Sequence, residues 1–496
     1  MSYKPEQFAP YMDMDASKFV LSQKNETLTD KKLDTQQVSF LKDAMRRFAR
    51  NRGSVICAWI ILALVLYAIF VPMVGRYSGT EYDAYYKYVL PRNELFVKLG
   101  IPFWDGTAKQ TVNQATYDYF DATGCIVESS DAYYGKGAAG QKVINYDVRY
   151  DSYKKVGFTS RKLSAEKLAE IRAYEQANGV QVLYPLIDNS KVANPGYKMN
   201  ADANAWYLSD QKGIAIRDEN GALQDIYLRD EAGEPLYEKA VMGGAQIEVR
   251  VFYPAYYEYL HGYEASFLFG ADSSGYDICA RLARGARLSL VLSVTVSLIS
   301  LVVGIIVGAL EGYYGGWFDL LMERVKDVLW QVPSVVFMSL FQIYFADKVG
   351  PAVSLFLCMI AFDWISTSST VRAQFYRFKG QEYILAARTL GAKDGRLIFR
   401  HILPNAAGFI ITASVLSIPG VIFSESNMTY LGIVNLQGTS TTSVGTMLSN
   451  GQSVLSTYPH CVFFPAIFIS ILLICFNIFG NGLRDAFNPS LRGADE

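Results

Sequence analysis

LSLVLSVTVSLISLVVGIIVGAL, residues 288–310, contains no charged side chain. The hydrocarbon core of a bilayer is about 30 Å thick, so a helix that crosses it needs roughly 20 apolar residues. Four further runs carry no charge and cover residues 55–74, 328–346, 402–424 and 461–483, and a fifth, residues 349–371, carries only Asp363. Runs of this length predict six membrane-spanning helices, because helices buried in a soluble core are rarely so long and so apolar.

The composition of the whole chain agrees with a membrane protein. Of its 496 residues, 51% are hydrophobic and only 19% are charged, with a formal net charge of −1. Without a domain-wide basic excess, we expect no nucleic-acid partner. The first apolar run begins beyond residue 50 and no small-residue cleavage site follows it, so we expect a permanent membrane helix rather than a cleaved signal peptide.

The distribution of Lys and Arg predicts the orientation, since cytoplasmic flanks are enriched in both. Residues 42–52 carry five of them, residues 372–400 carry seven, and residues 425–460 carry none. We therefore expect a multi-pass membrane protein with both termini in the cytoplasm. Arg281, Arg284 and Arg287 disagree with this orientation, and we expect them on a short interfacial helix with side chains that reach outward to water.

The predicted domains follow from these runs. We expect a cytoplasmic tail with an amphipathic helix (1–52), a first transmembrane helix (53–76), an extracytoplasmic domain (77–274), a five-helix core (275–488) and a cytoplasmic C-terminus (489–496). The fold class is mainly α, a polytopic membrane protein with six transmembrane helices and an α+β extracytoplasmic domain between the first and second helices.

The extracytoplasmic domain has its own pattern of secondary structure. A helix is predicted after Ser164, a good N-cap, and should end at Asn178-Gly179. Strands are predicted at residues 142–150, 179–187, 224–230 and 246–253, with turns at 218–221 and 231–234. We expect no internal repeat. Two tyrosine-rich stretches, residues 82–88 and 253–260, fit either a docking surface or the core of the domain.

The sequence predicts no catalytic, cofactor or metal site. The three histidines are far apart in the chain, and no phosphate-binding loop of the GxxxxGK[ST] type is present. Residues 270–277 are expected to form a structural turn rather than a calcium loop, because the twelve-residue ligand pattern is missing. The small residues Gly304 and Gly308, four apart, predict a close helix–helix contact.

Two acidic residues stand within or beside apolar runs, Asp363 and Glu425. An ionisable side chain inside a membrane is costly and usually faces a cavity or a partner. Both residues fit a cation or proton pathway, and both fit packed, hydrogen-bonded acids at helix ends, which is the interpretation that we favour.

EYILAARTLGAKDGRLIFRHILPN, residues 382–405, carries basic side chains, including Arg388 and Lys393, between two apolar runs. The stretch resembles the EAA loop of the permeases of binding-protein-dependent ABC importers. The residues that match the family pattern are Ala386, Ala387, Gly391, Leu403 and Pro404. The acidic residue of the pattern falls on Leu385, and Glu382 lies one helical turn earlier.

Other segments resemble the oligopeptide and dipeptide permeases of this family, in the same order. They are residues 41–55, 269–290, 312–329, 423–433 and 476–493, so the resemblance covers residues 40–76 and 267–493 and leaves out most of the extracytoplasmic domain. It implies a non-catalytic permease subunit of the C type, in which residues 380–404 are the loop that couples to the ATPases.

The resemblance also implies partners. They are a second permease, two cytoplasmic ATPase subunits that bind ATP and Mg²⁺, an extracytoplasmic peptide-binding protein and the surrounding membrane lipid. Two other functions fit the sequence. One is import of nickel or another small solute by a related permease, and the other is a membrane-anchored receptor or adhesion protein that acts through its outer domain.

Overall fold

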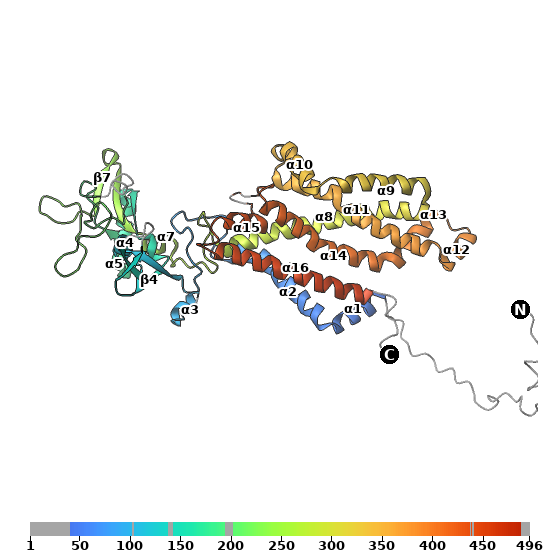
Figure 1. Ribbon diagram of the computed structural model, residues 1–496, viewed down its shortest axis with the longest axis horizontal. Helices are drawn as coiled ribbons and strands as arrows, with labels where there is room; N and C mark the ends of the chain where they lie inside the picture. Colours follow the sequence, from blue (N-terminus) through green and yellow to red (C-terminus); the bar gives the residue numbers. More distant parts are fainter. Residues whose placement is uncertain are drawn as a thin grey trace, which may run out of the picture.

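The computed structural model describes residues 40–101, 104–136, 142–193, 202–436, 438 and 441–487. The chain forms a long helical bundle with a separate domain at one end, which we call the sheet domain (residues 77–274) (Figure 1). The fold class predicted from the sequence, mainly α with an α+β domain between the first two long helices, is confirmed. The expected tail before residue 40 and the C-terminal segment 489–496 lie outside the described residues.

The bundle consists of helices from both ends of the chain. They are α1 (Phe40–Arg50), α2 (Arg52–Val74), α8 (Ile278–Tyr314), α9 (Gly316–Gln331), α10 (Ser334–Val349), α11 (Pro351–Lys379), α12 (Glu382–Thr389), α13 (Asp394–Arg396), the π-helical turn η6 (Leu397–Ile402), α14 (Leu403–Tyr430), α15 (Val444–Gln452) and α16 (His460–Phe487). Within the described ranges, five helical stretches are long and apolar enough to cross a membrane, and a sixth is counted if α9 and α10 form one span.

The third predicted span differs from the expectation. Residues 328–346 do not form one straight helix, because α9 and α10 meet at 82° across Val332 and Pro333. Proline lacks an N–H and moves the residue before it out of the helical region, so it breaks the helix there. Hydropathy could not reveal the break, since both flanks of Pro333 are apolar.

Arg281, Arg284 and Arg287 do not lie on a short interfacial helix with outward side chains, so that expectation is wrong. They lie in the first turns of α8 itself, and their side chains turn inward. Arg281 is buried against the Tyr276 ring, and Arg284 donates to the carbonyl of Ser78.

Arg287 bonds to the end of α2. Its Nε atom lies 3.1 Å from the carbonyl oxygen of Ala68, and one of its terminal nitrogens lies 2.8 Å from that of Ile69. Pro72 stands four residues after Ala68 and cannot donate to its carbonyl. The guanidinium therefore replaces a helix hydrogen bond that Pro72 removes.

The predicted contact at Gly304 and Gly308 is present between α8 and α11. A Cβ atom on Gly304 would lie 2.6 Å from Cγ2 of Thr367, and one on Gly308 would lie 2.3 Å from the carbonyl oxygen of Ser368. Only glycine allows the two helix backbones to approach so closely.

The sheet domain contains two antiparallel four-stranded sheets. In the first, β4 (Lys142–Asp151) pairs with β1 (Thr107–Asn113), β2 (Ile126–Ser129) and β3 (Tyr133–Lys136). In the second, β8 (Gln246–Phe252) pairs with β5 (Phe158–Leu163), β6 (Leu183–Tyr184) and β7 (Glu238–Val241). The other elements are α3 (Glu94–Lys98), α4 (Gln114–Thr123), α5 (Ala165–Asn178), α7 (Tyr253–His261) and the short turns η4 (Lys154–Val156) and η5 (Met242–Gly244).

The local signals of α5 are confirmed. The hydroxyl of Ser164 accepts a hydrogen bond from the backbone N–H of Lys167, and Gly179 ends the helix at φ +66°. The strands predicted at 142–150 and 246–253 correspond to β4 and β8, whereas only Leu183–Tyr184 of residues 179–187 is a strand.

Residues 207–235 contain a short repeat that we did not expect. Three narrow hairpins turn at Asp210–Gly213, Asp218–Gly221 and Asp230–Gly233. In each turn the aspartate carboxylate accepts backbone N–H bonds from the residues two and four positions later. The sequence did not reveal this repeat, because its copies are unequally spaced along the chain. It also replaces the strand predicted at 224–230.

The tyrosine-rich stretches mostly build the core of the sheet domain. The side chains of Tyr86, Tyr253, Tyr256 and Tyr257 are buried in one cluster, whereas those of Tyr82 and Tyr85 are exposed. Of the two interpretations left open by the sequence, the structure favours core packing for these buried tyrosines.

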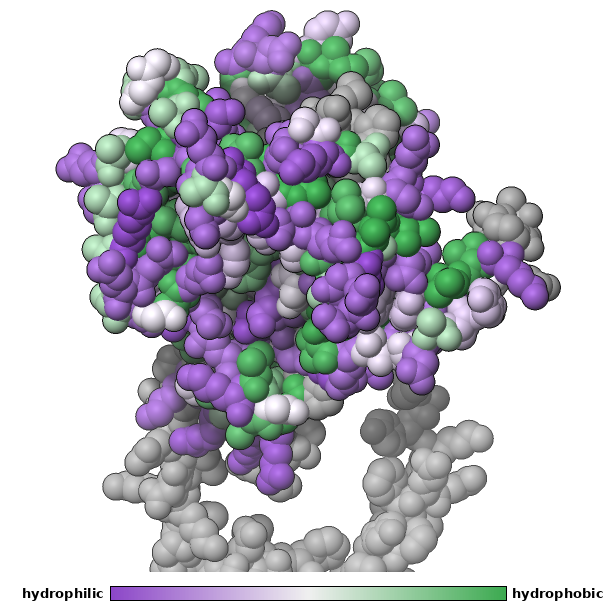
Figure 2. Space-filling view, turned by 90° about the vertical axis from the view of Figure 1, so that its left-hand side faces the viewer, coloured by the Kyte–Doolittle hydropathy of each residue, from purple (hydrophilic) through white to green (hydrophobic). Residues whose placement is uncertain are grey.

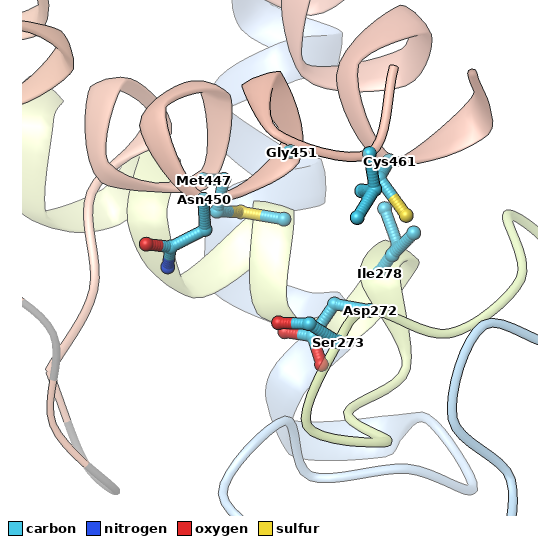
Figure 3. Close-up of a pocket in the computed structure, with 8 residues that line it drawn as sticks. Asp272, Ser273, Ile278, Met447, Asn450, Gly451 and Cys461 are labelled. Carbon is cyan, nitrogen blue, oxygen red and sulfur yellow. The ribbon is translucent and has the colours of Figure 1, made fainter. Parts of the chain in front are cut away.

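Aromatic contacts hold the sheet domain against the bundle. The ring of Tyr88 stacks on that of Tyr458 at 4.4 Å, and Phe269 stacks on Phe464 at 4.3 Å. Beside them, Asp272 and Ser273 face the ends of α15 and α16 across a narrow cleft (Figure 3). The turn at residues 270–277 is closed by the Asp272 carboxylate, which accepts from the backbone N–H of Ser274 and of Tyr276.

Candidate functional site

The candidate coupling loop, residues 380–404, lies at the end of the bundle opposite the sheet domain (Figure 1). Its helix α12 is anchored by one apolar side chain. Ile384 is completely buried against Phe375 of α11 and the side chains of η6, in a cluster that continues into α8 and α14. A short helix that would be marginal alone is thereby fixed to three long ones.

The rest of α12 faces away from the bundle. Leu385 and Ala386 are exposed, Ala387 is half-buried, and Leu390 just beyond the helix is 88% exposed. Glu382 and Arg388 are exposed at the two ends of the helix. The loop therefore offers a small, mixed apolar and charged surface on a firmly anchored helix.

Gly391 ends this helical stretch in a conformation that favours glycine. Its φ is +86°, its N–H donates to the carbonyl of Arg388, and the next N–H, of Ala392, donates to that of Ala387. An L-residue in this left-handed region costs about 1–2 kcal/mol.

The chain then enters the next long helix. Lys393 is exposed and precedes α13 without a capping hydrogen bond from its side chain, and α13 continues through η6 into α14. Leu403 is half-buried against the same apolar cluster as Ile384. Pro404 stands just after the π-helical turn η6, inside this continuous helical stretch, where its missing N–H interrupts the helix hydrogen bonds.

Polar contacts join the loop to α8. The hydroxyl of Tyr313 donates to a carboxylate oxygen of Asp394 at 2.5 Å, and a guanidinium nitrogen of Arg388 lies 3.3 Å from the same hydroxyl. Tyr313 thus links residues on both sides of Gly391 to the end of α8. This contact and the apolar cluster together connect α12 and the turn after it to the end of α8.

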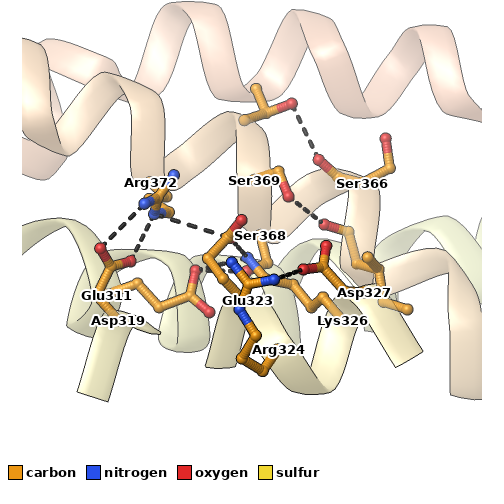
Figure 4. A network of polar contacts seen from close by, with 12 residues as sticks. Glu311, Asp319, Glu323, Arg324, Lys326, Asp327, Ser366, Ser368, Ser369 and Arg372 are labelled. Carbon is orange, nitrogen blue, oxygen red and sulfur yellow. Dashed lines mark hydrogen bonds and ion pairs between the residues drawn. The ribbon is translucent and has the colours of Figure 1, made fainter. Parts of the chain in front are cut away.

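A network of charges lies next to this link, between α8, α9 and α11 (Figure 4). Lys326 Nζ lies 2.9 Å from Glu311 Oε2 and 2.5 Å from Glu323 Oε1, and Ser368 donates to the same oxygen of Glu311. Glu311 is 0% exposed and Lys326 is 4% exposed.

The second half of the network is centred on Asp319. Two guanidinium nitrogens of Arg372 donate to the two carboxylate oxygens of Asp319 at 2.6 and 2.9 Å. The hydroxyl of Tyr376 donates to one of these oxygens at 2.7 Å. A bidentate pair of this kind fixes geometry as well as charge. The network therefore joins α9 to α8 and to α11, the helix that leads into the coupling loop.

Our sequence reasoning missed this network. Asp319, Glu323 and Lys326 recur at helical spacing, which places them on one face of α9. That spacing was the available signal. Nothing in a single sequence, however, indicates that Glu311 and Arg372 are their partners.

The two acids singled out from the sequence have different surroundings. Glu425 is buried and accepts hydrogen bonds from Ser289, Ser426 and Thr429. Asp363 lines a cavity between α9, α10, α11 and α14 instead. Within the described ranges, no three His, Cys, Asp or Glu side chains converge as metal ligands.

Two protein-family matches agree on the kind of protein to which this chain is similar. The family described as "Binding-protein-dependent transport system inner membrane component" matches residues 300–493, and the one described as "N-terminal TM domain of oligopeptide transport permease C" matches residues 39–91. Most of the sheet domain lies outside both matches.

Individual relatives agree with these matches. The chain is 41% identical over 224 residues to the oligopeptide transport system permease protein OppC of Bacillus subtilis, covering 45% of this chain and 72% of that protein. It is 36% identical to the dipeptide transport system permease protein DppC of the same organism (46% and 70% covered) and 37% identical to OppC of Escherichia coli K12 (46% and 74% covered). The chain belongs to the family of inner membrane components of binding-protein-dependent transport systems and is a multi-pass, non-catalytic membrane subunit.

Proposed function

We propose that this chain is the permease subunit of an ATP-driven importer of oligopeptides or dipeptides, and that it forms the translocation path with a second permease. The observation that carries the proposal is the anchored, outward-facing helix α12 at the end of the bundle opposite the sheet domain. The names of the relatives, which are peptide permeases, support peptides as the substrate class.

The coupling follows from the shape of the loop. Two ATPase subunits bind ATP and Mg²⁺, and one of them receives α12 in a groove that covers Leu385, Ala386 and Leu390. When the ATPases close, α12 moves and pulls α8 and α11 through Tyr313, Ile384 and the polar network. Alternating access is then a two-state equilibrium that ATP binding shifts.

This mechanism requires α12 to be cytoplasmic and the sheet domain to lie outside the cell. The excess of Lys and Arg in residues 372–400 supports that orientation, as does the position of the two features at opposite ends of the molecule. In a bacterial plasma membrane, both ends of the chain would then lie in the cytoplasm.

We also propose that the sheet domain receives an extracytoplasmic peptide-binding protein. Its outer face, seen end-on, is mostly hydrophilic with small separate apolar patches (Figure 2). A face of this kind suits a transient partner better than a permanent one, because obligate interfaces are more apolar. The three hairpins lie at the tip of the domain, far from the bundle (Figure 1).

Two of the three hairpins, residues 209–223, can be replaced together if Asp118 is also changed to Asn, because Arg217 and the N–H of Ala215 bind its buried carboxylate. The N–H of Leu208 donates to the carbonyl of Gln224 at 2.7 Å, so the ends of residues 209–223 lie side by side. Replacing these residues with an Asn-Gly turn, together with Asp118→Asn, should preserve assembly and lower the affinity of the complex for the binding protein. Unchanged affinity would exclude these two hairpins from docking.

The proposal as a whole is tested in proteoliposomes. The chain, its second permease and its ATPases are co-expressed, purified and reconstituted with the binding protein on the side of the sheet domain. ATP-dependent uptake of a labelled tripeptide is expected, with none in the absence of ATP. Failure of the ATPases to co-purify with this chain would contradict the proposal.

A further inference from the structure

The cavity that contains Asp363 has an unusual combination of side chains for the interior of a membrane protein. Its volume is about 170 Å³, and most of its lining is apolar. The residues that matter here are Trp330, Phe337, Phe362, Asp363, Ser366 and Ser424. An apolar pocket with a few convergent polar groups is the usual form of a ligand site.

Asp363 stands near the middle of the apolar run 349–371, which is expected to cross the membrane. It is the twelfth residue after Pro351, the first residue of α11, so it lies about 18 Å along the helix at 1.5 Å per residue. If α11 begins near one membrane surface, this length reaches about the middle of the ~30 Å hydrocarbon core. An acidic group at this depth is costly and needs a functional or structural partner.

One hydroxyl, that of Ser300 on α8, lies near the Asp363 carboxylate in the described part of this chain. The Oδ2 atom of Asp363 is buried and has no hydrogen-bond donor among the described residues. Glu425 is the opposite case, because three hydroxyl groups donate to its carboxylate. Both oxygens of Glu425 thus accept a hydrogen bond, whereas a buried oxygen of Asp363 accepts none from the described residues.

The cavity favours a cation over a neutral donor. A carboxylate attracts a positive charge strongly in a medium of low dielectric constant. Trp330, Phe337 and Phe362 also line the cavity, and aromatic rings can add cation–π attraction. A primary ammonium group also brings three donors, which Asp363 and the hydroxyls of Ser366 and Ser424 can accept.

The cavity is too small for a whole peptide, since sites for complete small-molecule ligands usually measure about 300–1,000 Å³. The cavity has room for one end or one side chain of a peptide. We propose that the Asp363 cavity is a subsite of the translocation path that binds a primary ammonium group of the passing peptide, either its α-amino group or a lysine side chain. This inference rests on the proposed function and adds a point of substrate recognition within the membrane.

The test uses Asp363→Asn, which keeps the shape and removes the charge, in the complete reconstituted complex. Three peptides separate the sources of the ammonium group: trialanine, N-acetyl-Ala-Lys-Ala and N-acetyl-trialanine. We expect kcat/KM for uptake to fall at least about tenfold for each peptide that carries an ammonium group and that the parent transports. Uptake of N-acetyl-trialanine, where the parent transports it, should be unchanged.

Two variants serve as controls. Asp347→Asn removes an exposed acid near the end of α10, outside the cavity, and should leave uptake unchanged. Asp363→Glu keeps the charge and should recover part of the trialanine uptake. Co-purification of the ATPases and basal ATP hydrolysis show whether each variant assembles.

The outcomes separate the two claims. If an assembled Asp363→Asn complex transports trialanine within twofold of the parent, or if Asp363→Glu is as defective as Asp363→Asn, the ammonium subsite is refuted and the proposed function stands. If the parent complex transports no peptide at all, the proposed function fails and the subsite fails with it.

Discussion

The Nζ atom of Lys326 lies 2.9 Å from Oε2 of Glu311, and both side chains are almost completely buried between α8, α9 and α11. Two charges removed from water stabilise a structure only while they remain paired. The pair therefore ties α9 to α8, and any movement between these two helices must keep the pair intact or replace its contacts.

The first prediction concerns this pair. Lys326→Met leaves the Glu311 carboxylate buried without its cation and should lower the free energy of unfolding by about 3–5 kcal/mol. The double variant Lys326→Met/Glu311→Gln should be more stable than Lys326→Met alone, because it removes the uncompensated charge. The measurement is the thermal denaturation midpoint of the purified complex in detergent.

Arg324 and Asp327 provide a matched control on the same helix. They form an exposed ion pair at 2.8 Å, so Arg324→Met should cost less than about 1 kcal/mol. Equal losses for Arg324→Met and Lys326→Met would mean that burial of the Glu311–Lys326 pair is not what stabilises this region.

The second prediction concerns the end of α12. Gly391→Ala places a side chain at φ +86° and should destabilise the loop by about 1–2 kcal/mol, while Gly391→Pro is incompatible with that φ. Gly391→Pro should assemble with the ATPases poorly or hydrolyse ATP without uptake. Gly395 has no left-handed backbone and open space around it, so Gly395→Ala should be neutral. Normal uptake by the Gly391→Pro complex would refute the role of this turn.

The third prediction concerns the α8–α11 contact. Gly308→Ala forces a methyl group to within 2.3 Å of the Ser368 carbonyl oxygen, so the helices must separate, at a cost of about 1–3 kcal/mol. Gly420 of α14 has nothing near its Cβ position, and Gly420→Ala should cost nothing measurable. The two variants are compared by thermal denaturation of the complex, and equal midpoints would contradict the tight contact.

The fourth prediction concerns pH. Burial raises the pKa of Asp277, the N-cap of α8, to about 6, while the N–H groups of Ala280 and Cys279 partly offset the rise and Asp272 adds to it. The folded state therefore prefers the protonated acid, and its stability falls as the pH rises from about 4 to 6. Asp277→Asn keeps a good cap without titrating.

The melting temperature of Asp277→Asn relative to the parent should consequently be higher at pH 7.5 than at pH 4.5. Both proteins are measured in the same detergent at each pH, so effects of pH on the rest of the complex cancel. A difference that does not change between the two pH values would show that Asp277 is not a source of the pH dependence.

Features that depend on neighbouring residues could be predicted from the sequence. Ser164 caps α5, Gly179 ends it, and Gly391 follows α12, because each acts on the backbone within a few residues. The apolar runs located the long helices for the same reason, since hydrophobicity along the chain decides whether a helix enters a membrane.

Features that depend on pairing between distant residues could not be predicted. Arg287 turns inward because Pro72, more than two hundred residues earlier, leaves the Ala68 carbonyl without its helix donor. Lys326 tolerates burial only because Glu311 and Glu323 lie beside it. In the candidate site, the sequence motif located the coupling loop. Its contact with α8 through Tyr313 and the different surroundings of Asp363 and Glu425 became visible only in the structure.

The most direct test of the account is photo-crosslinking in living cells, with a photoreactive amino acid at Leu390, on the tip of the coupling loop, or at Asn220, on a hairpin of the sheet domain. The account predicts that Leu390 crosslinks to an ATPase subunit, that the yield changes when ATP is depleted, and that Asn220 gives no ATPase adduct. An ATPase adduct from Asn220, or none from Leu390 in cells where the assembled complex is present, would contradict it.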